Sequence, residues 1–255
     1  MTKQFLRSAV LIILSVSVFF SCKKTHSLNP YPDNVRLLNF TKSTKYASGA
    51  PTLNETYRFV YDGYNRVSQI THTKDDGSQS LIKTLAYRND TIFDTTRYLN
   101  LQNVQQTAFY ITDQKGMIGV TYEPASTTTY DYIGKLVTKR AYSNSNYYTY
   151  TSYNYNLTRR ISSIDAVNNE EYSYYTDKFN RIGDYIQLNS FLQYGFNFYQ
   201  NDNLIWKIKK VTGDISVDYD IDAYNKITKT TALVSDSAGH LLQTETYDLQ
   251  YEIYR

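Results

Sequence analysis

The chain has 255 residues, with 27 basic and 24 acidic side chains and a formal net charge of +3. A nearly neutral chain offers no electrostatic basis for binding nucleic acid, and a single cysteine excludes an internal disulfide or a zinc site built from several thiolates. The chain carries 28 tyrosines, 11 phenylalanines and one tryptophan. Tyrosine suits the half-buried surface of a β-sheet, so the composition favours an all-β fold.

The N-terminal segment has the pattern of an export signal. Lys3 and Arg7 precede an apolar run from Val10 to Phe20, which ends just before Cys22. A basic start and an apolar run of this length are typical of a secretory signal peptide, because a membrane-spanning helix needs about 20 apolar residues. We therefore predict a signal peptide over residues 1–21 and an exported mature chain. Without Lys3 and Arg7, 25 of the 27 basic residues remain, and the mature net charge is about +1.

The place of Cys22 resembles that in bacterial lipoprotein signals. This resemblance implies that the thiol carries a diacylglycerol, that the new amino terminus is acylated, and that the protein is held at a membrane through Cys22. Residues 22–34 contain Asn29-Pro30-Tyr31-Pro32 and no alternation, which predicts a tether between the lipid and the fold. Lys23-Lys24 stand where surface-exported lipoproteins carry an acidic tract, so the expected address is the periplasmic face of the outer membrane.

One phrase recurs through the body of the chain. It consists of an aromatic-alternating run that ends in tyrosine, a turn with Asp, Asn or Gly, and a basic residue before β-branched positions. One unit is about 22 residues long, which leaves room for two strands and two tight turns. The anchor tyrosines are Tyr61, Tyr87, Tyr110, Tyr130, Tyr153, Tyr175, Tyr199 and Tyr219. Each unit therefore predicts a β-hairpin, and the array predicts an antiparallel meander.

The predicted domain covers residues 35–255 without an internal boundary. Val35 to Phe40 is expected to be its first strand and Tyr247 to Tyr254 its last. About sixteen strands exceed what an open twisted sheet tolerates, so the meander should be strongly curved or barrel-like. The alternation of Phe196 and Phe198 predicts a further strand.

Some of the predicted strands that follow these turns break the two-residue alternation of apolar side chains. Their apolar pairs are spaced by three, which indicates a β-bulge or a strand that is apolar on both faces. These pairs are Val67/Ile70, Ile161/Ile164 and Ile205/Ile208. Repeated bulges would add twist and curvature to the sheet.

The clearest copies of the phrase are Tyr61-Asp62 with Asn65-Arg66-Val67, and Tyr130-Asp131 with Gly134-Lys135-Leu136. They resemble the YD repeat of Rhs-type β-sheet proteins. Together with the lipoprotein signal, the whole chain is similar to uncharacterised Bacteroidota lipoproteins, including a domain of unknown function described as porin-like in fold. This resemblance implies an envelope protein with a β-hairpin array, and it transfers no catalytic residues.

Residues with catalytic or metal-binding chemistry have simpler interpretations. Asp218, Asp220 and Asp222 alternate, but Ala223 and Lys229 stand where a calcium loop needs glycine and glutamate. The turn acids recur with the repeat, as expected of residues that hydrogen-bond their own turns. The sequence contains no zinc-hydrolase or serine-hydrolase motif and no glycine-rich phosphate loop, so no metal, cofactor or enzymatic activity is predicted.

Aromatic side chains are the remaining candidates for binding. Tyrosine and tryptophan rings stack on sugars and peptides, although aromatics with a period of two also pack as cross-strand ladders. The candidate ligand-stacking residues are Tyr147, Tyr148, Tyr150, Tyr199 and Trp206. The sequence therefore predicts a non-enzymatic, lipid-anchored envelope protein that acts as a scaffold or contacts another envelope protein. The alternative is a glycan- or peptide-binding accessory lipoprotein.

Overall fold

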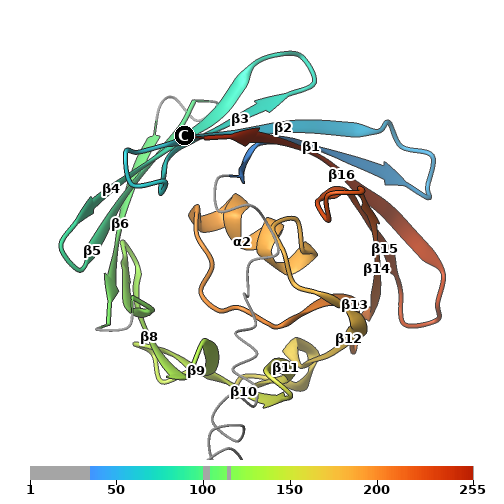
Figure 1. Ribbon diagram of the computed structural model, residues 1–255. Helices are drawn as coiled ribbons and strands as arrows, with labels where there is room; N and C mark the ends of the chain where they lie inside the picture. The colour runs from blue at the N-terminus through green and yellow to red at the C-terminus, as the bar shows by residue number, and fades with distance from the viewer. Residues whose placement is uncertain (1–34, 100–103, 114–115, 255) are drawn as a thin grey trace, which may run out of the picture. The chain divides into compact units, whose positions relative to one another are not determined.

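A computed structural model of the chain describes residues 35–99, 104–113 and 116–254, which all belong to one compact unit. Sixteen antiparallel strands follow one another around a closed barrel (Figure 1). The strands are β1 (Val35–Tyr46), β2 (Leu53–Tyr61), β3 (Val67–Lys74), β4 (Gln79–Arg88), β5 (Thr91–Tyr98), β6 (Val104–Thr112), β7 (Ile118–Glu123), β8 (Ser126–Ile133), β9 (Leu136–Tyr142), β10 (Tyr147–Tyr153), β11 (Asn156–Ser162), β12 (Glu170–Phe179), β13 (Asn203–Lys210), β14 (Gly213–Ile221), β15 (Ile227–Ser235) and β16 (Leu241–Ile253). The predicted all-β meander is confirmed. Cys22 and the tether lie outside the described residues.

The barrel closes where its first and last strands pair. β1 runs antiparallel to β16 from Val35 opposite Ile253 to Tyr46 opposite Gln243. Closure leaves no free sheet edge, because every strand has a hydrogen-bonded neighbour on both sides. The sequence left a curved sheet and a barrel open, and this pairing decides for the barrel.

The recurring phrase forms the turns at one end of the barrel. In the β2–β3 turn, the Asp62 carboxylate accepts hydrogen bonds from the backbone N–H groups of Tyr64 and Arg66, at 2.9 and 3.0 Å. Asn65 has φ of 60°, a left-handed conformation that asparagine tolerates. The β14–β15 turn repeats this arrangement around Asp222.

Successive strands alternate in direction, so the β2–β3, β8–β9, β10–β11 and β14–β15 turns share the end at which β1 starts. We call this end the N-terminal rim and the other the opposite rim.

The predicted bulges occur where the chain leaves the N-terminal rim. The register shifts on β3 between Val67 and Gln69, and on β13 between Ile205 and Lys207, so both predicted pairs flank a bulge. The third pair is wrong as a bulge site, because Ile164 lies beyond the end of β11. On β11 the irregularity falls between Leu157 and Arg159, nearer the turn.

Residues 180–202 leave the wall and carry a helix into the barrel. Helix α2 (Tyr185–Tyr194) lies inside the ring of strands (Figure 1), and its buried Leu188 belongs to the same core as wall residues. A short 3₁₀ turn, η1 (Ala166–Asn168), joins β11 to β12. The strand predicted at Phe196 and Phe198 is therefore wrong. Both rings pack inside the barrel, where Phe198 stacks on Tyr130 at 5.0 Å.

Two residues determine where the helix starts and ends. Asp184 is the N-cap residue. Its carboxylate accepts hydrogen bonds from the backbone N–H groups of Ile186 and Gln187, which have no partner within the helix. Gly195 ends the helix at φ of 80°, a conformation favoured by glycine. A Cβ atom at this position would lie 2.5 Å from Leu85 Cδ1 of the wall, so glycine also permits the close approach between helix and wall.

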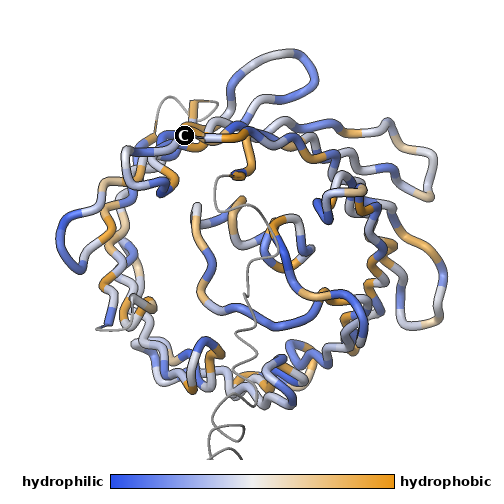
Figure 2. The backbone as a smooth tube through the Cα atoms, in the orientation of Figure 1, coloured by the Kyte–Doolittle hydropathy of each residue, from blue (hydrophilic) through white to orange (hydrophobic). Residues whose placement is uncertain are grey.

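The two faces of the wall differ in polarity. Hydrophobic and hydrophilic residues alternate along the strands (Figure 2). On β14 the buried positions are Ile215, Val217 and Tyr219, and the outward ones between them are acids or serine. A barrel that crosses a bilayer has an outward apolar band about 25 Å tall. On β1, β14 and β16 the outward positions are mostly polar, so these three strands do not contribute to such a band.

None of the helices in the described ranges has both the length and the apolar character needed to cross a membrane.

Candidate functional site

The interior of the barrel is polar toward the opposite rim. Polar side chains occupy inward positions in that half of several strands and are nevertheless buried. They include Thr44, Ser80, Lys83, Asp94, Thr96 and Glu245. Glu245 accepts hydrogen bonds from the hydroxyls of Tyr247 and Tyr185, at 2.9 and 3.2 Å. Buried polar groups of this kind require partners, and because this group contains a buried ion pair we take it as the candidate functional region.

A buried ion pair lies at the centre of this region. Lys83 on β4 and Asp94 on β5 are only 6% and 4% exposed, and the Lys83 ammonium binds Asp94 Oδ2. The register places Leu85 opposite Asp94, so Lys83 and Asp94 are diagonal neighbours on the inner face. The pair is held between two adjacent strands of one hairpin.

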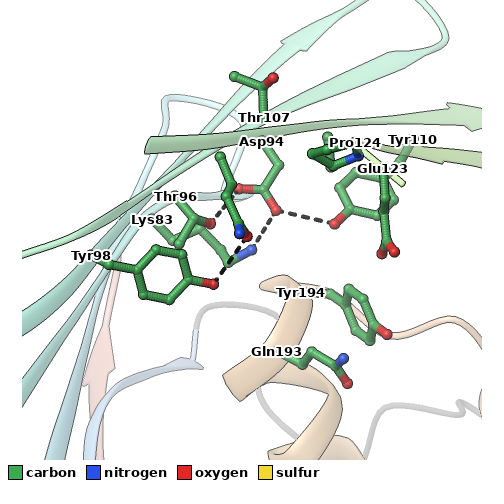
Figure 3. A pocket seen from close by; sticks show the side chains of 12 residues that line it. Lys83, Asp94, Thr96, Tyr98, Thr107, Tyr110, Glu123, Pro124, Gln193 and Tyr194 are labelled. Atoms are coloured by element: carbon green, nitrogen blue, oxygen red, sulfur yellow. Dashed lines mark hydrogen bonds and ion pairs between the residues drawn. The ribbon is translucent and has the colours of Figure 1, made fainter. Parts of the chain in front are cut away.

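Two hydroxyl groups complete the coordination of the Asp94 carboxylate. Thr96 donates a hydrogen bond to Oδ1 at 3.0 Å, and Tyr110 donates one to Oδ2 at 3.1 Å (Figure 3). Burial and the neighbouring Asp94 charge raise the pKa of the Tyr110 phenol, which therefore remains a donor. With three partners, Asp94 is a structural acceptor rather than a free base.

A hollow of about 230 Å³ opens beside this ion pair. Its walls come from β4 to β7, the turn after β7 and the C-terminal end of α2 (Figure 3). The lining residues include Tyr98, Gln106, Glu123, Gln193 and Tyr194. Tyr98 and Glu123 are the last residues of their strands, so the hollow lies at the opposite rim.

The hollow offers hydrogen-bonding groups of several kinds beside aromatic rings. Gln106 and Gln193 supply amides and Glu123 a carboxylate, while Tyr98 donates a hydrogen bond to Gln106 Oε1 at 3.4 Å. Pockets for drug-sized ligands measure about 300–1,000 Å³, so this one suits a smaller molecule. Its chemistry matches a compact ligand that carries several hydroxyl groups.

A second interior group links a serine, a histidine and a glutamate. Ser80 Oγ lies 2.5 Å from His72 Nδ1, and His72 Nε2 lies 3.0 Å from Glu55 Oε1. The Tyr57 ring stacks on the imidazole at 4.4 Å, and Ser80 is 6% exposed. These contacts join three strands, and because the hydroxyl is covered they present no nucleophile to a substrate.

Three of the five predicted stacking residues face the interior. Tyr150 and Tyr199 pack against the core. Burial raises the pKa of the Tyr150 phenol. Tyr148 shares the inner face of β10 with Tyr150, and the Arg160 guanidinium lies 4.9 Å from its ring centre. These rings contribute to the packing of the barrel.

The other two predicted residues lie on the outer wall. Tyr147 is on β10 and carries Lys139 over its ring at 5.2 Å, and Trp206 is on β13. Two strands, β11 and β12, separate them. The structure does not bring the five candidates together into one surface.

Sequence reasoning did not select Lys83 or Asp94. The sequence nevertheless contained a signal for this pair. Lys83 falls on the same strand face as Leu85 and Tyr87, and Asp94 falls on the same face as Ile92. A charge on an otherwise apolar strand face requires a buried partner. In the described ranges no group of three or more His, Cys, Asp or Glu side chains is arranged to hold a metal ion.

Comparison with known proteins identifies the fold. The chain is similar to a porin-like protein from Bacteroides uniformis, with a TM-score of 0.65 and 15% identity over 89% of this chain and 100% of that one. A porin-like protein from Bacteroides vulgatus matches with a TM-score of 0.36 and 13% identity, over 82% of this chain and 97% of that one. No protein-family model and no curated protein matches the sequence. The match to the Bacteroides uniformis protein confirms the expected porin-like fold.

Proposed function

We propose that the protein is a non-enzymatic, lipid-anchored binding protein of the cell envelope, and that the hollow beside Lys83 and Asp94 binds a small saccharide. The proposal is supported by the lining of this hollow, which combines amide, carboxylate and ammonium groups with the rings of Tyr98 and Tyr194. The hydroxyl groups of a sugar can hydrogen-bond to these polar groups, and the apolar face of its ring can stack on the tyrosine rings.

A binding role is favoured over catalysis by the state of the reactive groups. Asp94 is engaged by Lys83, Thr96 and Tyr110, and the Ser80 hydroxyl is buried. A glycosidase needs two carboxyl groups about 5–9.5 Å apart, one to donate a proton and the other to act as base or nucleophile. Asp94 and Glu123 both line the hollow, but Asp94 is held by Lys83, Thr96 and Tyr110 and is not available for either role.

The proposed address is the periplasmic face of the outer membrane, with Cys22 as the lipidated residue. In a bacterium that processes lipoproteins, we expect the wild-type chain to incorporate labelled palmitate and to sediment with membranes. Cys22→Ser should incorporate no label and should appear in the soluble periplasmic fraction. Equal labelling of both chains would contradict the anchor.

We expect a panel of monosaccharides and disaccharides, titrated by calorimetry, to contain a ligand for the mature chain. Gln106→Leu should weaken its binding by about tenfold, because the ligand would lose a hydrogen-bond partner inside the hollow. Gln105→Leu is the matched control, since Gln105 is the adjacent residue on the outer face of β6.

The outcomes of this titration separate the candidate functions. Equal affinity of the Gln106→Leu and Gln105→Leu variants would exclude the hollow. Binding that is lost in Tyr147→Ala or Trp206→Ala would place the saccharide on the outer wall. If no saccharide binds, an anchored scaffold that contacts another envelope protein becomes the better explanation.

A further inference from the structure

The most exposed apolar side chains of the described residues gather at one end of the barrel. All six large apolar or aromatic side chains that are more than 70% exposed lie at the N-terminal rim. They are Tyr64, Ile133, Tyr153, Tyr155, Tyr224 and Ile253. At the opposite rim, the most exposed such side chain is Val211 at 58%. We call the six side chains at the N-terminal rim the aromatic rim, since four of them are tyrosines.

These side chains are spread around the circumference. They come from the β2–β3, β10–β11 and β14–β15 turns and from the ends of β8, β10 and β16. Because these strands are spread around the wall of the barrel, the six side chains form an interrupted ring rather than one patch. A flat, extended surface can touch such a ring at all its points, whereas a protein partner usually covers one contiguous area.

Tyr155 is exposed at a conformational cost. Asn154 and Tyr155 have φ of 48° and 60°, the conformation of a type I′ hairpin turn. Glycine is favoured at the second of these positions, and a bulky residue there is strained. Strain of this kind is concentrated at functional sites, so the exposed Tyr155 ring points to a role outside folding.

The rim tyrosines are accompanied by basic side chains whose charges are already paired. Arg66 lies 4.9 Å from the ring centre of Tyr64 and 2.6 Å from Asp62. Lys226 lies 5.7 Å from the ring centre of Tyr224 and 4.0 Å from Asp222. The attraction of the rim for a surface would thus depend on its amphipathic rings rather than on net charge.

The chain enters the barrel at this same rim. β1 begins at Val35, opposite Ile253. Thirteen residue steps separate Val35 from Cys22, a distance of at most about 45 Å. A lipid on Cys22 would therefore keep the aromatic rim close to the bilayer, where even weak contacts are populated.

We propose that the aromatic rim docks on the lipid surface that holds Cys22, with its tyrosine rings among the headgroups. Tyrosine is enriched at membrane interfaces because its ring is apolar and its hydroxyl is polar. The hollow at Lys83 and Asp94 lies at the opposite rim and would face the aqueous phase. The docking rests on the lipid anchor proposed above.

The test places tryptophan at defined points of the lipidated protein. In a Trp206→Phe background, Tyr155→Trp is compared with Leu242→Trp on vesicles of phosphatidylethanolamine and phosphatidylcholine that contain a brominated lipid as quencher. We expect quenching of at least about twofold at position 155 and none at position 242, which lies at the opposite rim. A protein that floats with the vesicles but shows equal quenching at both positions would overturn the docking and leave the anchor intact.

A second measurement removes the anchor. The mature chain with Cys22→Ser should still bind these vesicles weakly, and Tyr64→Ser, Tyr155→Gly and Tyr224→Ser together should lower its partition coefficient by about tenfold. Leu241→Ser with Leu242→Ser is the matched control at the opposite rim and should change little. The Tyr155→Gly change should not impair folding, because glycine is favoured at that turn position. Equal partitioning of the rim and control variants, or capture by the rim of an envelope protein in place of lipid, would contradict the proposal.

Discussion

Replacing Lys83 with methionine is expected to lower the free energy of unfolding by about 3–5 kcal/mol, the range found when one partner of a buried ion pair is removed. Methionine fills a similar volume, so the loss would come from the Asp94 carboxylate. This group would remain 4% exposed without a counter-charge, and the hydroxyls of Thr96 and Tyr110 cannot replace an ammonium. Urea unfolding followed by circular dichroism at pH 7 measures the effect.

A double-mutant cycle separates the ion pair from the packing. Combining Lys83→Met with Asp94→Asn should recover most of the loss, because the amide oxygen still accepts hydrogen bonds and no charge is left buried. Lys45→Met is the control at an exposed position of β1, with an expected change within about 0.5 kcal/mol. Additive losses in the double variant would show that Lys83 and Asp94 act independently and would contradict this account.

Asp184→Ala is expected to destabilise the barrel by about 3 kcal/mol at pH 7, since four donors share this buried carboxylate. Two are the N–H groups at the start of α2. The others are the Ile205 N–H of β13 at 3.2 Å and the Tyr219 hydroxyl of β14 at 3.1 Å. Asp184 thereby attaches the inner helix to the wall. Urea unfolding measures the loss, and a change below about 1 kcal/mol would mean that the donors find other partners.

The same residue should make stability depend on pH. Burial raises the pKa of Asp184 from 3.8 to about 6, so the folded protein binds this proton more tightly than the unfolded chain. The stabilisation by protonation is present below about pH 3.8 and is lost as the pH rises through about 6. Relative to Asp184→Asn, which does not titrate, the wild type should gain about 2 kcal/mol between pH 7.5 and pH 4.5. A difference that stays constant over this range would show that the pKa is not raised.

The functional proposals depend on the two ends of the barrel being different. The turns of the N-terminal rim present exposed rings, as at Tyr64 and Tyr224, while the strand ends at the opposite rim surround the hollow. An antiparallel meander sends all odd-numbered hairpin turns to one end and all even-numbered turns to the other. One repeated phrase, placed once per hairpin, therefore returns to the same rim each time.

Much of the local structure could be predicted from sequence. Tyr61 ends β2 and Tyr219 lies two residues before the end of β14, the following Asp62 and Asp222 organise turns, and the first strand starts at Val35. These features depend on residues within a few positions of one another. The break in alternation between Val67 and Ile70 likewise indicated a bulge that the register confirms.

The strand prediction was wrong at a segment that alternates between apolar and polar residues but lies inside the barrel. Phe196 and Phe198 alternate as in a strand, yet they follow α2 inside the barrel, where Tyr194 and Phe198 meet edge-to-face at 4.5 Å. Residues inside a barrel are surrounded on all sides, so their pattern does not report a two-faced sheet. The helix itself is short and polar at several positions, which weakened its periodic signal.

The sequence by itself determined the hairpin period, the turn positions and the inward alternation of apolar residues, because each of these depends on interactions within one hairpin. The tertiary structure alone decided that β1 pairs with β16, that α2 occupies the interior, and that Tyr147 and Trp206 lie apart on the outer wall. It also placed the hollow between β4–β7 and the end of α2, which are about seventy or more residues apart in the chain. Such contacts depend on how the whole sheet closes, and the local bulges indicated curvature but not which strands would meet.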